Sequence, residues 1–239
     1  MPGLYEDEGI VLKAIKLGEA DRIVTVFTRS NGKVRAVAKG VRKTKSRFGG
    51  RLEPFTYIDV MFYRGRSLDT VTQVHVLDSF KAVRADYASF TAASALAEVT
   101  EKITEERECQ FSTYSLLLGG LQALAAGGSS TIVPAFLVKL LSVSGYHPSL
   151  KVCAGCGDAS SLVGFSSSLG GAVCETCRYE DDSSFRLRPE QLALLTRLLS
   201  AEFGEAAGAQ DTIDITHVLR RYAEYHLERP LRSLQLLDA

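Results

Sequence analysis

The chain has 239 residues, of which 46% are hydrophobic and 23% charged, and its 28 basic residues balance its 28 acidic ones. This is the composition of an ordinary folded globular protein. No apolar run approaches the roughly 18 residues that a membrane span needs, and the first residues lack the pattern of a secretory signal. We therefore expect a cytoplasmic protein with no membrane partner.

The charge is unevenly distributed along the chain. Residues 1–80 carry a net charge of +5, and residues 81–239 carry −5. Because the chain is also long for one compact core, we expect two domains, 1–80 and 81–239, with different partners.

Residues 9–78 are typical of short strands with no helix between them. Asn31-Gly32, between Arg22–Thr28 and Lys33–Lys39, is a strong hairpin signal. In the second of these strands Val34, Ala36 and Ala38 should face a core. In a further strand, Thr56–Tyr63, Ile58, Val60 and Phe62 should do the same. With a last strand at Asp69–Leu77, the pattern predicts a small antiparallel barrel.

Ten basic residues and no carboxylate lie between Arg22 and Leu52. A segment of one charge sign creates a strong local field, and phosphate backbones are its commonest partner. The alternative is a solvated surface without a partner. The length of the segment and its glycine-punctuated loop, Gly40–Gly50, favour a polyanion. Single-strand binders add aromatic stacking to charge, and the candidates for stacking are Phe48, Tyr57 and Tyr63.

The apolar period changes to that of helices after about residue 80. The predicted helices are Tyr87–Glu106, Ser112–Ala126, Thr131–Gly145, Pro189–Phe203 and Asp214–Glu228.

Four of the five cysteines form two Cys-x-x-Cys pairs, Cys153/Cys156 and Cys174/Cys177, separated by a glycine-rich loop. This spacing is typical of a tetrahedral zinc site. Four thiolates leave no position for a reactive water, so Zn²⁺ here should be structural. Two pairs of redox thiols are the alternative. The sequence contains no complete phosphate-binding loop, Gly-x-Ser-x-Gly or His-Glu-x-x-His motif, so we expect no enzyme and no catalytic residues.

Several longer motifs resemble the bacterial recombination mediator RecO family, over essentially the whole chain and in the family's order. They are Gly9–Leu12, Glu19–Val24, Ala38–Arg42, Ser46–Phe55, Gly145–Leu150, the cysteine pairs, Tyr225–Glu228 and Arg232–Leu234.

The resemblance implies an α+β chain with an N-terminal OB-fold barrel and a helical C-terminal domain that carries an inserted zinc element at about 150–180. It implies binding of single- and double-stranded DNA, annealing of complementary strands, and loading of RecA onto DNA coated by single-strand-binding protein, together with RecR and possibly RecF. It also implies association with the nucleoid during repair. The candidate DNA-binding residues are Lys33, Arg35, Lys39, Arg42, Lys43, Lys45, Arg47, Phe48, Arg51, Arg64 and Arg66.

Three other hypotheses remain from the residues alone. The barrel could bind an acidic partner protein, because an acidic protein and a nucleic acid require the same cations. The target could be RNA instead of DNA. A zinc hydrolase would need an open metal position, which four thiolates do not leave.

Overall fold

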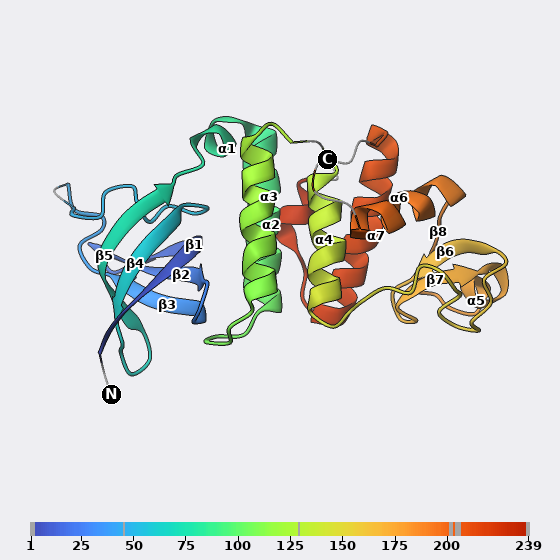
Figure 1. Ribbon diagram of the computed structural model, residues 1–239, viewed down its shortest axis with the longest axis horizontal. Helices are drawn as coiled ribbons and strands as arrows, with labels where there is room; N and C mark the ends of the chain where they lie inside the picture. The colour runs from blue at the N-terminus through green and yellow to red at the C-terminus, as the bar shows by residue number, and fades with distance from the viewer. Residues whose placement is uncertain (1–2, 45, 129, 201–202, 204–206, 238–239) are drawn as a thin grey trace. The chain divides into compact units, whose positions relative to one another are not determined.

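The computed structural model describes residues 3–44, 46–128, 130–200, 203 and 207–237. The chain forms two compact units, one of Met1–Ala93 with Ala97–Ala125 and one of Ser94–Leu96 with Ala126–Ala239. Strands dominate the first part of the chain and helices the rest, so the predicted α+β class is confirmed (Figure 1). No helix among the described residues is long and apolar enough to cross a membrane.

Five strands close into a barrel in the order β1-β2-β3-β5-β4, as predicted. All neighbouring strands are antiparallel except β3 and β5. The first strand serves two neighbours, since its beginning pairs with β4 and its end with β2. The strands are β1 (Leu4–Leu17), β2 (Asp21–Thr28), β3 (Gly32–Ala38), β4 (Tyr57–Tyr63) and β5 (Asp69–Asp78).

The barrel core follows the predicted alternation. On β3, Val34, Ala36 and Ala38 are at most 1% exposed, and the inward residues of β4 are equally buried. Because side chains of a strand point alternately to its two faces, the intervening residues of β3 point out of the barrel. This places Arg35 on the outer surface, where it is exposed.

A later part of the chain helps to close the barrel at the joint between β3 and β5, which is its shortest strand pairing. The parallel pairing of β3 with β5 covers just Ala36↔Asp69 and Val37↔Thr70. Beside it, the segment of residues 104–110 runs along the start of β3, with a parallel bridge between Lys33 and Glu106. Here the sequence prediction was wrong, because the predicted helix to Glu106 ends at Ile103 and Thr104 is already extended.

A buried carboxylate fixes this joint. The side chain of Asp69 is fully buried and accepts a hydrogen bond from the hydroxyl of Tyr5 and one of 2.8 Å from the guanidinium of Arg107. The backbone N–H of Gly65 donates a third, of 2.9 Å. Burial raises the pKa of Asp69, but these three donors outweigh it and hold the pKa below its usual range.

Three helices follow the barrel, α1 (Lys81–Ala85), α2 (Tyr87–Ile103) and α3 (Phe111–Ala125), and all of their residues except Ser94–Leu96 belong to the first unit. The ring of Tyr114 on α3 lies 6.5 Å from that of Phe27, which points out of the barrel from β2. Phe27 is fully buried, so the barrel shares an apolar contact with its own helices.

The second unit combines helices with a small sheet of order β7-β6-β8. Helix α4 is buried along most of its length and packs against α6 and α7. Phe165 of the sheet meets Tyr222 of α7 edge to face at 5.1 Å. The elements are α4 (Ile132–Val143), β6 (Leu162–Ser166), β7 (Gly171–Cys174), α5 (Glu175–Tyr179), β8 (Ser184–Arg186), α6 (Pro189–Ser200), α7 (Ala209–Leu227) and α8 (Arg232–Gln235).

Candidate nucleic-acid interface and metal centre

The loop between β3 and β4 is held against the barrel by apolar side chains. Val41, Phe48 and Leu52 belong to the barrel core, at 8%, 2% and 1% exposure. At the end of the loop, the backbone N–H of Phe55 donates to the carbonyl of Val11 at 2.7 Å. The loop is therefore anchored at several points, although its described residues form no helix or strand.

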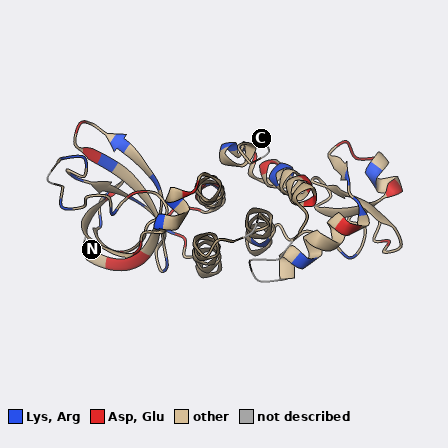
Figure 2. Ribbon diagram, turned by 90° about the horizontal axis from the view of Figure 1, so that it is seen from above, with Lys and Arg blue, Asp and Glu red and all other residues tan. Residues whose placement is uncertain are grey.

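Between these anchors the loop presents its basic residues to solvent. Its exposed cations are Lys39, Arg42, Lys43, Arg47 and Arg51. No ion pair involves any of the five within the described part of the chain. Arg42 is positioned over the β1–β2 turn, because its backbone N–H donates to Ala20 and its guanidinium to the carbonyl of Gly18, at 2.9 and 3.1 Å. Figure 2 shows basic residues along this loop.

Other cations of the acid-free segment already have carboxylate partners. Arg22 pairs with Glu53 at 2.7 Å, Arg29 with Glu8 at 3.7 Å and Arg35 with Glu106 at 3.5 Å. These carboxylates come from outside the segment Arg22–Leu52. The segment therefore contains no acidic residue, but acidic residues lie close to it in the folded chain.

Two candidate DNA-binding residues make contacts within the fold. The ammonium group of Lys33 donates to the backbone carbonyls of Glu101 and Thr104, where it satisfies the C-terminal end of α2. It is thus engaged in holding the fold together. Phe48 was expected to stack on a base, but its ring is buried in the barrel core because the loop uses it as an anchor.

Two further candidates, Arg64 and Arg66, lie outside the β3–β4 loop. Since β3 and β5 run parallel, the β4–β5 turn with Arg64 and Arg66 lies at the end of the barrel opposite to the β3–β4 loop (Figure 1). There Arg64 lies over the ring of Tyr5, 4.9 Å from its centroid. Lys45 lies outside the described residues.

Sequence reasoning missed one exposed cation on the same outer surface. Lys13 of β1 is opposite Thr25 of β2, which in turn is opposite Arg35 of β3. The three side chains therefore form one row across the sheet. Glu19 and Asp21 separate Lys13 from the basic segment along the chain, so no local pattern relates it to Arg35.

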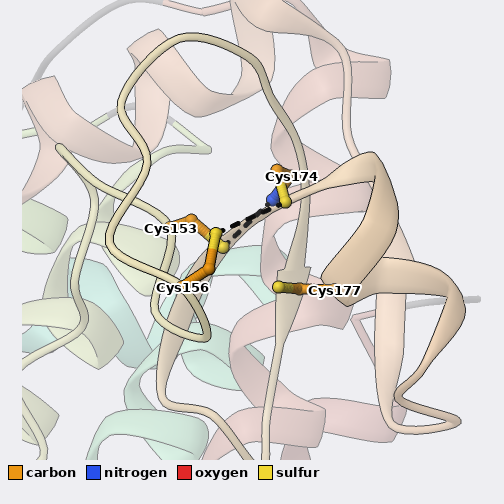
Figure 3. A group of neighbouring side chains, drawn as sticks. All are labelled: Cys153, Cys156, Cys174 and Cys177. Atoms are coloured by element: carbon orange, nitrogen blue, oxygen red, sulfur yellow. Dashed lines mark hydrogen bonds between the residues drawn. The ribbon is translucent and has the colours of Figure 1, made fainter.

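The four cysteines of the two pairs converge in the second unit. Cys153 and Cys156 lie in a tight turn, Cys174 ends β7 and Cys177 lies on α5, and their sulfur atoms are within 4.8 Å of one another (Figure 3). The Sγ atoms of Cys156 and Cys174 are 3.8 Å apart. A side chain at Gly155 would approach the Sγ of Cys177 to 2.9 Å, so this turn requires glycine.

The surroundings of the Cys153 sulfur favour its thiolate form. Burial raises the pKa of Cys153, but the backbone N–H groups of Cys156, Cys174 and Gly155 outweigh it and lower the pKa to about 6. Four sulfurs at this separation, with backbone donors to one of them, fit a tetrahedral metal ion.

The chain is similar to a set of proteins of one name along its whole length. A family model described as recombination protein O, N terminal, matches residues 1–80, and one described as recombination protein O, C terminal, matches residues 84–235. "DNA repair protein RecO" of a Nocardioides species is 43% identical over 244 residues, covering 98% of this chain and 99% of that protein.

Two further relatives carry the same name. The one from Thermobifida fusca is 43% identical and covers 98% of each chain. The one from Bifidobacterium adolescentis is 42% identical and covers 98% of this chain and 99% of its own.

Proposed function

Because this chain belongs to the RecO family of DNA repair proteins, we propose that it is a non-catalytic mediator that binds DNA through the β3–β4 loop. The observation that carries the proposal is the group of five exposed cations without carboxylate partners in the described chain, on a loop anchored by buried apolar residues. An anchored cationic loop presents its charges to a phosphate backbone with less loss of conformational freedom than a mobile one.

The contacts are directed at phosphates. The aromatic residues of the loop, Phe48 and Phe55, are both buried, so base stacking by Phe48 is not part of the proposal. Lysine and arginine contacts to phosphates carry no sequence information, so the protein should bind single- and double-stranded DNA with little sequence preference.

We further propose Zn²⁺ as the metal ion of Cys153, Cys156, Cys174 and Cys177. Four cysteine thiolates in tetrahedral arrangement are one of the usual structural zinc sites. The ion would stabilise the turn, the small sheet and α5, and it would take no part in chemistry.

In the cell, the chain would anneal complementary strands and help RecA onto DNA coated by single-strand-binding protein, with RecR and, in some settings, RecF. Family membership supports this part of the proposal. We assign no residue of this chain to these partner proteins.

Charge reversal of the loop tests DNA binding. If its five cations each meet one phosphate of a single strand, the log–log salt slope should be about −3.5, or roughly a hundredfold loss of affinity between about 50 and 200 mM salt. The variant Lys39→Glu/Arg42→Glu/Lys43→Glu/Arg47→Glu should nearly abolish binding of an oligonucleotide, measured by fluorescence anisotropy.

The double variant Arg64→Glu/Arg66→Glu, at the other end of the barrel, is the matched control and should retain most of the affinity. Unchanged affinity in a folded loop variant would reject the loop as the interface. An annealing assay on coated DNA, with and without RecR, tests the mediator role.

A further inference from the structure

The segment between α2 and α3, residues 104–110, lies as an acidic strap along β3. Besides the bridge between Lys33 and Glu106, the backbone N–H of Arg107 donates to the carbonyl of Lys33 at 3.0 Å. The strap approaches the hairpin so closely that a Cβ at Gly32 would lie 1.9 Å from the carbonyl oxygen of Glu108. Its side chains include three glutamates, Glu105, Glu106 and Glu108.

The register of the strap is fixed by Arg107. This residue has a left-handed backbone, with φ of 62°, and its guanidinium is bound by the buried carboxylate of Asp69. The ion pair with Asp69 on one side and the backbone hydrogen bond to Lys33 on the other hold the strap in this register along β3. The neighbouring residue, Glu106, is thereby held beside Arg35, with 3.5 Å between the Oε1 of Glu106 and the Nη1 of Arg35.

Both partners of this ion pair are about half exposed, at 44% for Arg35 and 50% for Glu106. A phosphate group can therefore reach Arg35 from solvent and compete for it. Arg35 also shares a row with Lys13 on the outer surface of β1, β2 and β3. Without its ion pair to Glu106, Arg35 would extend the cationic surface from the loop onto the strands.

We propose that Glu106 occupies Arg35 as an internal substitute for phosphate and so limits the affinity of the interface for a DNA strand. The inference rests on the proposed DNA binding. In this role Glu106 sets how far the interface reaches onto β3, and a strand must displace its carboxylate before it contacts Arg35.

The test compares Glu106→Gln with Glu105→Gln, an equal change of charge at the next position of the strap. Since exposed ion pairs are worth up to about 1 kcal/mol, Glu106→Gln should bind labelled oligo-dT about two- to fivefold more tightly than Glu105→Gln. The salt slope should also steepen by about 0.7, because one more phosphate is neutralised. In an Arg35→Gln background the difference between the two variants should vanish. Equal affinities and equal slopes for the two variants would overturn the proposal.

Elution from immobilised heparin separates this inference from the proposed function. Heparin is a polyanion without bases, and Glu106→Gln should elute at higher salt than Glu105→Gln whether or not DNA is the natural ligand. If the two variants still differ in elution but the chain fails to bind oligo-dT, the inference about Glu106 is supported and the proposed DNA binding is rejected. If the two variants elute equally and bind oligo-dT equally well, the inference about Glu106 is rejected and the proposed DNA binding stands.

Discussion

Phe48 lies in the barrel core while its neighbours Arg47 and Gly49 in the loop are exposed. Truncating a buried aromatic residue leaves a cavity. Phe48→Ala should therefore lower the free energy of unfolding by about 3 to 5 kcal/mol in a urea titration.

The conservative change Phe48→Leu separates this role from base stacking. Leucine refills most of the space, so oligonucleotide affinity should stay within about twofold of the wild type. A stacking residue would instead lose about 1 to 3 kcal/mol of binding free energy.

Asp69 gives the barrel a dependence on pH. Its pKa is lower in the folded chain than in the unfolded chain, so its contribution to stability is present above the ordinary pKa of about 4 and is lost as the pH falls through the folded value. Asp69→Asn removes the charge that Tyr5 and Arg107 bind and should lower the free energy of unfolding at pH 7 by about 1.5 to 3 kcal/mol.

The deficit of this variant should shrink in urea titrations below about pH 4, where the wild type also loses its carboxylate. Asp59→Asn, on the outward face of β4, is the control with the same chemical change. A deficit that stays constant from pH 7 to pH 3 would contradict the role of the carboxylate charge.

At the scale of elements, the barrel strands could be predicted because each has a buried and an exposed face, which the alternation of β3 and β4 records directly. The end of α2 could not be predicted. Residues 104–106 continue a helix-compatible sequence, Thr-Glu-Glu, and they leave the helix to pair with β3, a partner some seventy positions away. For the same reason the sequence did not reveal the internal contacts of Lys33 and Phe48, which are set by tertiary packing, and the candidate DNA-binding site stays a prediction.

The element around the cysteines should depend on its metal ion. Few apolar residues are buried in the turn that carries Cys153 and Cys156, so metal ligation would supply much of its stability, on the order of 10 kcal/mol for small zinc sites. Chelation or Cys153→Ser should unfold the turn, β7 and α5. Amide hydrogen exchange would detect this as loss of protection within 150–180, with protection of the barrel unchanged.

Cys109→Ser is the matched control, since this cysteine lies in the strap, outside the cysteine cluster. If the stripped protein exchanges like the untreated one, the metal ion is not structural.

At the scale of the whole molecule, the opposite net charges of the two parts of the sequence suggested a boundary near residue 80, and that domain division stays a prediction. The compact unit that contains the barrel continues to Ala125, because α3 buries Phe27 and the strap joins β3. The charge distribution and the apolar periodicity of the sequence give no information on these contacts of α3 and the strap with the barrel.

A fragment of residues 1–80 should accordingly be less stable than one of residues 1–125. It exposes the ring of Phe27 and leaves Lys33 without its carbonyl partners, a loss of at least about 3 kcal/mol. Thermal unfolding followed by circular dichroism would check this, and equal midpoints for the two fragments would contradict it.

The strap also imposes an order on biosynthesis. The last barrel strand ends at Asp78 and the strap ends near residue 110, so at roughly 5 to 20 residues per second the nascent barrel waits about 2 to 6 seconds for the segment that covers β3. During that interval the start of β3 is an open strand edge on the ribosome. Lysine and arginine are the side chains that discourage such an edge from pairing with another chain, and Lys33 and Arg35 stand at this edge. The cations of β3 thus protect the barrel before it is complete as well as contribute to its outer surface afterwards.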